Sequence, residues 1–539
     1  MADTDNKPHD AARASTATSA ETDAALRQRR KVDDLLALAP AKSNASLTLA
    51  DGHRLDYAVH AGFVPVTADG MGAERGDPQA AVFTVAYTVS ASKAGADKPG
   101  AMGGKQGKRG KPPGPRPVCF AFNGGPGSSS IWLHLGALGP KRVPVNDDGS
   151  LARSPYGLVD NPLSWLAHFD LVFIDPPQTG WSLSASDAAR KKHLSVDGDV
   201  DALVEVMRGW LAAHGRFGSP LYLAGESYGT TRGAAMADRL LDTGLALDGL
   251  ILVSCAMDLQ SLVFAPRNDL PYTLFLPGFA RTAQYHGTLK GALAASPDAA
   301  AQAADAFVQQ DYLAALHAGA RLGNTARRRI EKRLAELTGL PLDMVAEYNL
   351  RISDQSFFVN ALRARGQLVG RLDARATAPM AATRERQMAF DPGIEGVAIP
   401  YTTATLAYFA ELGLPVSRRY EVLSMPAHKA WNWQRGKDDD VADSKGFTST
   451  SNDLARALRR NPHMRVLVAS GHYDLGTPSA ASDWSLAQLD APAEVLARIS
   501  HHYYDAGHMM YTRLADLAKL SLDLGQWLQA GQDKPSLAG

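Results

Sequence analysis

The stretch Leu221–Gly229 reads LYLAGESYG, and a helix-compatible run, TTRGAAMADRLL, follows it at once. A short apolar run that ends in G-x-S-x-G and leads into a helix is the setting in which this pattern carries a nucleophilic serine. Gly225 and Gly229 leave room for a strained turn that lifts the Ser227 hydroxyl clear of its neighbours. The amino end of the following helix favours negative charge on a reacting oxygen. The sequence therefore predicts a nucleophile at Ser227, although a bare G-x-S-x-G also arises by chance in a chain with 48 glycines.

A second glycine-rich loop supports this interpretation. Residues 123–130 read NGGPGSSS, directly after the apolar run VCFAF and before a helical run. Because Gly124 and Gly125 carry no side chain, backbone amides of this loop can come close to a ligand. Acyl transfer needs such donors about 3 Å from the carbonyl oxygen as it becomes negative. We expect an oxyanion hole formed by the amides of Gly125 and of Tyr228, the residue after the nucleophile. The alternative, a phosphate-binding nest, lacks the G-K-[ST] sequence.

Strand-like and helix-like runs alternate around these two motifs, which favours a mostly parallel sheet flanked by helices. Between about 257 and 460 the alternation stops and the composition is helical. The sequence therefore predicts an α/β-hydrolase fold with a large, mainly helical cap insertion. The expected strands lie at 118–122, 171–175, 221–225, 247–254, 464–470 and 494–506. The expected parts are a disordered tail (1–30), a first core part (31–256) with a flexible loop (92–117), the cap (257–460) and a second core part (461–539).

Composition limits the classes of function. Lysine plus arginine and aspartate plus glutamate both total 56, which removes any overall electrostatic case for a nucleic-acid partner or an anionic membrane. No run of 18 or more apolar residues occurs, so no membrane-spanning helix is expected. Cys119 and Cys255 are too few for a disulfide framework and are expected to be buried free thiols. No metal or other cofactor is implied, because the chain has no H-E-x-x-H or paired-cysteine ligand pattern.

The first 26 residues lack the basic start and the apolar core of a secretory signal. The sequence as written therefore predicts a cytoplasmic protein. A misassigned start codon or a trimmed signal would make it a periplasmic or secreted one. Oligomeric state has no signature in the sequence.

An acid and a base complete the predicted nucleophilic site. The α/β-hydrolase order is serine, then acid, then histidine. Asp474 follows the strand-like run MRVLVAS inside the tight turn GHYDLGTP, and His508 follows the next strand in DAGHMMY. We assign His508 as the base that takes the Ser227 proton, and Asp474 as the acid that orients it. From the residues alone, rivals stay open. They are His472, His501 and His502 for the base, and Asp483 and Asp505 for the acid.

The motifs NGGPGSSS, IDPPQTGWS, GESYG, HYDLGTP and DAGHMMY resemble the serine carboxypeptidase family in order and spacing. The resemblance covers roughly residues 80–255 and 460–530 and selects Ser227, Asp474 and His508 over their rivals. The family commonly has N-G-G-P-G-C-S in the first motif. Ser128 stands here in place of that cysteine, which fits a bacterial-type member without disulfides. The resemblance implies hydrolysis of C-terminal peptide bonds in a peptide substrate through an acyl-enzyme.

Substrate recognition departs from the family pattern. The family binds the substrate carboxylate through an Asn, two Glu and a Trp. The Asn is matched by Asn123 and one Glu by Glu226, so the resemblance gives Asn123, Gly124 and Glu226 as substrate-binding residues. Ala121 stands where the Trp would lie, and Ala137 where the second Glu would open an E-L-G-P run. These changes weaken the inference of C-terminal specificity and leave the acyl-transfer chemistry untouched.

The loss of the second carboxyl has a physical consequence. Two carboxyls held close share one proton, and that arrangement favours acid pH. With Ala137 as its neighbour, Glu226 can be kept protonated by burial alone, so we expect a milder acid preference or a shifted substrate class. Glu226 could instead be a structural carboxylate that binds the amides of its own turn. A basic cap residue could replace the lost carboxyl, and several arginines occur in the cap, for instance Arg363, Arg371 and Arg375.

Three hypotheses therefore follow. The first is a serine carboxypeptidase. The second is another serine acyl hydrolase on the same scaffold, such as an esterase, an acyltransferase or a different exopeptidase, which Ala121 and Ala137 permit. The third, a non-catalytic binding protein, has the weakest support because the nucleophile, base, acid and oxyanion loop are all present.

Overall fold

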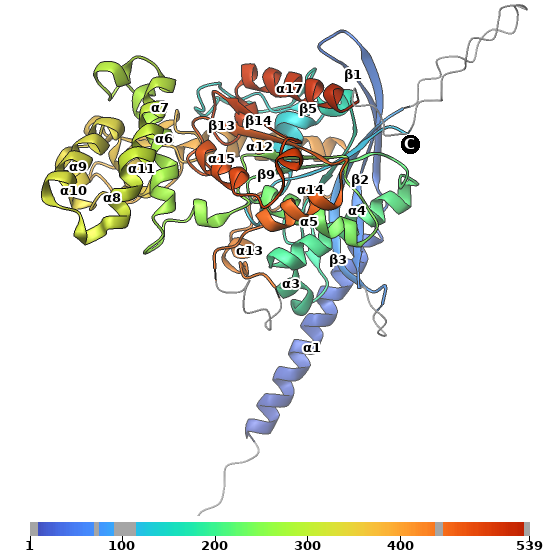
Figure 1. Ribbon diagram of the computed structural model, residues 1–539. Coiled ribbons are helices and arrows are strands. Elements are labelled where there is room, and N and C mark those ends of the chain that lie inside the picture. Colours follow the sequence, from blue (N-terminus) through green and yellow to red (C-terminus); the bar gives the residue numbers. More distant parts are fainter. Residues whose placement is uncertain (1–8, 69–74, 91–114, 437–445, 533–539) are drawn as a thin grey trace, which may run out of the picture.

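The computed structural model describes residues 9–68, 75–90, 115–436 and 446–532, and Figure 1 shows their arrangement. In these ranges the main sheet has ten strands. They are β1 (Ala41–Thr48), β2 (Arg54–Thr67), β3 (Pro78–Val89), β4 (Val118–Phe122), β7 (Asp170–Ile174), β8 (Leu183–Ser184), β9 (Leu221–Glu226), β10 (Gly249–Val253), β13 (Arg465–Gly471) and β14 (Ile499–Tyr504). Two short hairpins are made by β5 (Lys141–Arg142) with β6 (Val159–Asp160), and by β11 (Gln367–Val369) with β12 (Thr377–Pro379).

The order of strands in the main sheet is β1-β2-β3-β7-β4-β9-β10-β13-β14, and β8 pairs with β3. The strands from β7 to β14 are parallel, whereas β1, β2 and β3 are antiparallel to their neighbours. This is the mostly parallel, helix-flanked sheet of an α/β-hydrolase, as predicted. In such sheets ligands bind beyond the carboxyl ends of the strands, and the Ser227 turn follows central strand β9.

The helices are α1 (His9–Leu36), α2 (Ile131–Leu133), α3 (Asp187–His193), α4 (Val196–His214), α5 (Tyr228–Asp242), α6 (Leu270–Tyr285), α7 (Pro297–Phe307), α8 (Leu313–Ala318), α9 (Asn324–Thr338), α10 (Leu342–Glu347), α11 (Asp354–Asn360), α12 (Pro392–Glu411), α13 (Met425–Lys429), α14 (Ser451–Arg460), α15 (Ser479–Ala487), α16 (Ala493–Leu496) and α17 (Leu514–Gln532). Their ends follow capping rules. Ser195 caps α4 by accepting a hydrogen bond from the Gly198 amide, and Gly215 ends it with φ 62°.

Two hydrophobic layers cover the sheet. Side chains alternate along a strand, so Leu250 and Leu252 pack against α4, α5 and α14 on one face. Ile251 and Val253 pack on the other face against α12 and α17. The central strands read as continuous apolar runs because both of their faces are buried.

The inserted segment divides into two parts. Helices α6 to α11 form a lobe, green to yellow in Figure 1, around a hydrophobic cluster that also includes Tyr473 and Leu475. By contrast, α12 packs into the core cluster of the sheet, and α14 packs against α5. Two helices within the expected cap, α12 and α14, therefore bury their apolar faces on the α/β core.

The expected disordered tail needs correction. Helix α1 begins at His9, because an alanine-rich run with few helix breakers favours a helix. Its last turns are fixed by Val32 and Leu35, which pack against Ala81 and Ala185. Figure 1 shows α1 projecting from the body, with its C-terminal end near β3. The loop expected at 92–117 lies almost wholly outside the described residues. Cys119 and Cys255 are buried free thiols, as expected.

Candidate active site

Ser227 lies at the junction of β9 and α5 in a strained backbone conformation, with φ 61° and ψ −128°. A non-glycine residue adopts such angles only where its surroundings impose them. A Cβ on Gly225 would overlap the carbonyl oxygen of Gly229, and a Cβ on Gly229 would lie 3.0 Å from the carbonyl oxygen of Phe122. The Ser227 amide donates to the Val253 carbonyl at 2.9 Å, which ties the turn to β10. Only glycines therefore allow this turn to pack so closely.

The glycine loop after β4 packs directly on this turn. A Cβ on Gly124 would overlap the amide nitrogens of Tyr228 and Gly229, so the loop needs glycine at that position to lie against the start of α5. Gly125, with φ 100°, Ser227 and Tyr228 line one cavity of about 510 Å³. The two residues expected to supply oxyanion-hole amides thus lie at the wall of the cavity that Ser227 also lines.

Asp474 and His508 form a buried hydrogen-bonded pair. His508 Nδ1 lies 2.7 Å from Asp474 Oδ2. The other carboxylate oxygen accepts the amides of Gly476 and Thr477 at 2.8 and 2.9 Å, and the Thr477 hydroxyl donates to Oδ2 at 2.6 Å. Burial alone would raise the pKa of Asp474, but the charge and hydrogen bond of His508 and the bonds from Thr477 lower it. The carboxylate is therefore held ionised.

The same interaction acts on the imidazole in the opposite sense. Burial would lower the pKa of His508, but the Asp474 charge and hydrogen bond outweigh burial and raise it. The pair therefore favours a proton on Nδ1 and stabilises the imidazolium when it forms.

Two contacts link the His508 loop to the Ser227 turn. Val253 accepts the amide of Ser227, and the next residue, Ser254, donates its hydroxyl to the His508 carbonyl at 2.6 Å. Thr477, 3.3 Å from His508 Nδ1, lines the same cavity as Ser227. The nucleophile turn and the His508 loop are therefore both fixed to the end of β10.

The rival histidines have other partners. His501 Nδ1 lies 2.9 Å from Asp483 and its Nε2 lies 2.9 Å from Ser470. His502 lies 3.4 Å from Asp523, and His472 stacks on Tyr503. The structure thus brings Asp474 to His508 and to none of these three side chains.

Glu226 and Asn123, expected to bind substrate, are almost wholly buried, with 3% and 2% exposure. The Tyr511 hydroxyl donates to Glu226 Oε2 at 2.6 Å, and the Asn123 side chain also hydrogen-bonds Glu226. Burial raises the pKa of Glu226 to about 7, against the lowering effects of His508 and Tyr511. Both side chains are engaged inside the protein, and Glu226 is close enough to His508 for the two charges to interact.

The departures from the family pattern lie in the hydrophobic core. Ala121 and Ala137 have no exposed surface. Of the three candidate arginines, Arg363 donates to the carbonyls of Arg384 and Glu385, and Arg375 pairs with Asp373. Those two are occupied elsewhere, whereas Arg371 lines the cavity beside Ser227.

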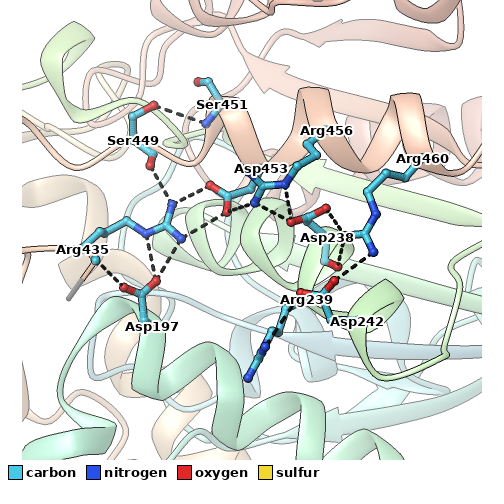
Figure 2. Close-up of polar contacts among 11 residues, drawn as sticks. Asp197, Asp238, Arg239, Asp242, Arg435, Ser449, Ser451, Asp453, Arg456 and Arg460 are labelled. Carbon is cyan, nitrogen blue, oxygen red and sulfur yellow. Dashed lines mark hydrogen bonds and ion pairs between the residues drawn. The ribbon is translucent and has the colours of Figure 1, made fainter. Parts of the chain in front are cut away.

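An aromatic wall borders the cavity next to Tyr228. The rings of Trp431 and Trp433 meet the Tyr228 ring edge-on at centroid distances of 5.2 and 5.6 Å. Figure 2 shows the ion pairs that hold this segment in place. Arg435 bridges Asp197 at the start of α4 and Asp453 in α14, at 2.9 and 2.5 Å.

A buried ion pair also connects helices α4 and α5 to the glycine loop after β4. Arg232 Nε donates to Asp199 Oδ2 at 2.6 Å, and both side chains are 1% exposed. Arg232 Nη1 also donates to the Asn123 carbonyl at 2.8 Å. This pair fixes α5, α4 and the loop after β4 relative to one another.

Sequence reasoning did not assign roles to Tyr511, Thr477 or Arg232. Tyr511 and Thr477 lie inside the motifs DAGHMMY and HYDLGTP, so the sequence pointed to both residues but did not show what they contact. Arg232 had a weaker signal, since it is a cation within the helix-compatible run that follows the Ser227 turn. In the described ranges no helix has the length and apolarity to cross a membrane. No cluster of three or more His, Cys, Asp or Glu suited to a metal ion occurs among those same residues.

Comparison with known proteins agrees with the motifs. Serine carboxypeptidase-like 36 and Serine carboxypeptidase-like 44, both from Arabidopsis thaliana, are 33% and 37% identical over 120 and 140 residues. Carboxypeptidase Y homolog A from Botryotinia fuckeliana (strain B05.10) is 31% identical over 113 residues. These matches take in 22%, 24% and 21% of this chain and span 23%, 26% and 18% of the relatives' own lengths.

Solved structures show a looser likeness. A proline iminopeptidase from Mycobacterium smegmatis aligns over 91% of this chain and 98% of its own, with 12% identity and a TM-score of 0.34. A putative aryl esterase from Burkholderia cenocepacia aligns over 91% and 100%, with 11% identity and the same TM-score. The assignment of fold rests on the strand order of the main sheet. A family model described as serine carboxypeptidase matches residues 108–259, the segment that holds the glycine loop and the Ser227 turn.

Proposed function

We propose that this protein is a serine carboxypeptidase that hydrolyses C-terminal peptide bonds through an acyl-enzyme on Ser227. The observation that carries the proposal is the cavity where the strained Ser227 turn, Gly125 and Tyr228 meet the Thr477 side of the Asp474–His508 pair. Nucleophile, oxyanion donors and an oriented base at one cavity are the requirements of acyl transfer.

In this scheme His508 takes the Ser227 proton as the oxygen bonds to the scissile carbonyl carbon. The amides of Gly125 and Tyr228 stabilise the negative oxygen that results. His508 then gives its proton to the leaving amine as the C–N bond breaks. Water, deprotonated by the same imidazole, attacks the ester carbon. The bond from that carbon to the Ser227 oxygen then breaks, His508 returns the proton to this oxygen, and the shortened peptide is released. Asp474 holds the imidazole in the required tautomer throughout.

A second candidate is another serine acyl hydrolase, such as an esterase. The observation that favours it is that Ala121 and Ala137, where the family pattern has Trp and Glu, are buried in the apolar core and cannot bind a carboxylate.

One incubation distinguishes the two. A free-acid peptide, its C-terminal amide and a simple ester are each mixed with enzyme, and the products are followed by mass. We expect sequential loss of residues from the free C-terminus. Cleavage of the ester alone would select the second candidate, and no turnover of any of the three would contradict both. Ser227→Ala serves as the control for contaminating hydrolases.

A further inference from the structure

The cavity that Ser227 lines also has a positively charged side chain in its wall, and the scheme above gives this side chain no role. The side chain of Arg371 lines this cavity. Within the described ranges it makes no hydrogen bond or ion pair, in contrast to Arg363, which binds two carbonyls, and Arg375, which pairs with Asp373. A guanidinium carries five donors, and a partly buried one without a partner is unusual.

The backbone of Arg371 is fixed to the catalytic loops. Its amide donates to Asp391 at 2.8 Å, and its carbonyl accepts the amide of Leu475, next to Asp474, at 3.0 Å. The following residue, Leu372, accepts the His508 amide at 2.6 Å. Arg371 is therefore held by the segment that also holds His508. A Cβ at Gly476 would lie 3.5 Å from its Cζ, so the guanidinium lies against the Asp474 turn.

The rest of the cavity suits an apolar side chain beside a charge. Leu259, Leu262, Val263 and Phe275 line it together with Trp433. Its other charged or titratable lining residues are Tyr228, Asp354 and His428. The Asp354 carboxylate accepts the Gln355 amide at 2.7 Å, and His428 Nδ1 lies 3.2 Å from the Pro126 carbonyl. Burial raises the pKa of Asp354, and the charge of Arg371 partly opposes that rise.

We propose that Arg371 is a specificity-determining residue that binds the carboxylate of the substrate's C-terminal residue, on the leaving-group side of the scissile bond. This inference rests on the proposed function. In that scheme His508 delivers a proton to the leaving nitrogen, so the leaving residue lies beside the His508 loop. Its carboxylate is one carbon away from that nitrogen. A planar guanidinium binds a carboxylate through two parallel hydrogen bonds.

The proposal explains how recognition survives without the family's second glutamate. Glu226 is already bonded to Tyr511 and Asn123, and Ala137 offers no carboxyl. The unpaired cation supplies charge complementarity directly, whereas a carboxyl must first be protonated. Recognition by Arg371 therefore does not require acid pH.

The test compares a blocked dipeptide with two apolar residues, benzyloxycarbonyl-Phe-Leu, with its C-terminal amide. We expect Arg371→Met to lower kcat/KM for the free acid by roughly 10-fold to 100-fold, the usual loss of a charge-assisted hydrogen bond. Turnover of the amide should change by less than about threefold, which is the limit expected without a lost contact. Arg371→Lys keeps the positive charge but loses the two parallel donors, so its kcat/KM for the free acid should lie between those of wild type and Arg371→Met. Arg363→Met, the same change outside the cavity, is the matched control.

Binding separates this inference from the proposed function. In a Ser227→Ala background, calorimetry should show that Arg371→Met weakens binding of the free acid and leaves binding of the amide unchanged. Equal losses for acid and amide, or no loss for either, would overturn the role of Arg371 even if the enzyme hydrolyses peptides. Absence of any peptide hydrolysis by the wild-type chain would overturn the proposed function, while the binding difference would still report on Arg371.

Discussion

At the scale of single residues, the ionisation of Glu226 affects the pKa of His508. Glu226 precedes the nucleophile, is buried, and has a pKa of about 7 because burial disfavours its ionised form. When it ionises, its negative charge raises the pKa of His508 further, after the larger effect of Asp474. In the proposed scheme His508 acts as a base only when neutral, so the charge on Glu226 raises the lower pH limit of activity.

Glu226→Gln should therefore move the acid limb of the kcat/KM profile to lower pH. The substitution removes the negative charge near His508 and keeps an oxygen that can accept the Tyr511 hydroxyl. The profile is measured with one peptide from about pH 5 to 9, the range in which such groups titrate. An acid limb that stays in place or moves to higher pH would contradict the coupling.

Unfolding of the same variant provides an independent control. Between the ordinary pKa of 4.5 and about 7, native Glu226 binds a proton that the unfolded chain has lost. Its cost to stability therefore grows as pH rises through this window and is constant above it. Relative to wild type, Glu226→Gln should gain stability in urea as pH rises from about 4.5 to about 7, the interval set by those two pKa values.

The sequence predicted residue types better than it predicted contacts. The G-x-S-x-G turn, the NGGPG loop and the order of Asp474 and His508 are local or ordered patterns, and each gives a residue number. The partner of Glu226 is not local, since Tyr511 lies 285 residues away in the chain. Arg371 could be named as one of three candidates, but only the fold shows which arginine lines the cavity.

At the scale of elements, the aromatic wall is held in place by the ion pairs of Arg435. Trp431 and Trp433 precede Arg435, which joins the wall to α4 and α14 (Figure 2). Burial would lower the pKa of Arg435, but its hydrogen bond and charge interaction with Asp453 and the charge of Asp197 raise it. The guanidinium is therefore permanently charged and bound on both sides.

Arg435→Met should raise KM by roughly threefold to tenfold with little change in kcat, because the wall would no longer be held against Tyr228 while the triad keeps its own bonds. That change corresponds to about 0.6–1.4 kcal/mol of substrate binding. Arg460→Met is a matched control from the same network, since Arg460 binds Asp238 and Asp242. A fall in kcat without a change in KM would show that Arg435 acts on the chemistry instead.

Among the elements, the sequence patterns located the strands better than they identified the surface that each helix covers. Five of the six expected parallel strands lie within two residues of their predicted bounds, because continuous apolar runs between turn residues mark them. The sixth, expected at 494–506, spans only Ile499–Tyr504 and follows helix α16. Helices α12 and α14 were assigned to the cap because the strand–helix alternation stops there, yet their apolar faces lie on the α/β core. Periodicity identifies an apolar face and does not say what covers it.

At the scale of the whole molecule, the helical lobe and the catalytic loops share one core. Tyr473 and Leu475 flank Asp474 in the chain and belong to the hydrophobic cluster of the lobe. Phe279 and Phe357, at the centre of that cluster, stack at 4.1 Å and are almost wholly buried. Loss of the lobe would therefore remove the packing that holds the Asp474 turn.

Phe279→Ala should destabilise the lobe by about 3–5 kcal/mol, the usual cost of a large cavity in a core. We expect activity and helical circular dichroism to be lost at the same, lowered urea concentration. If activity instead persists after the helical signal of the lobe has gone, the lobe and the catalytic loops unfold independently. Phe390→Ala, at a residue 42% exposed, is the control for a phenylalanine outside that core.

The most direct test of the central claim is to find where the acyl group is attached. A fluorophosphonate reacts with an activated serine, forming a P–O bond as fluoride leaves, and so mimics the acyl-enzyme. Mass spectrometry of the digested protein should show one adduct, on the peptide that contains Ser227, and none in Ser227→Ala or His508→Ala. An adduct on another residue, or equal labelling of the His508→Ala variant, would contradict the account.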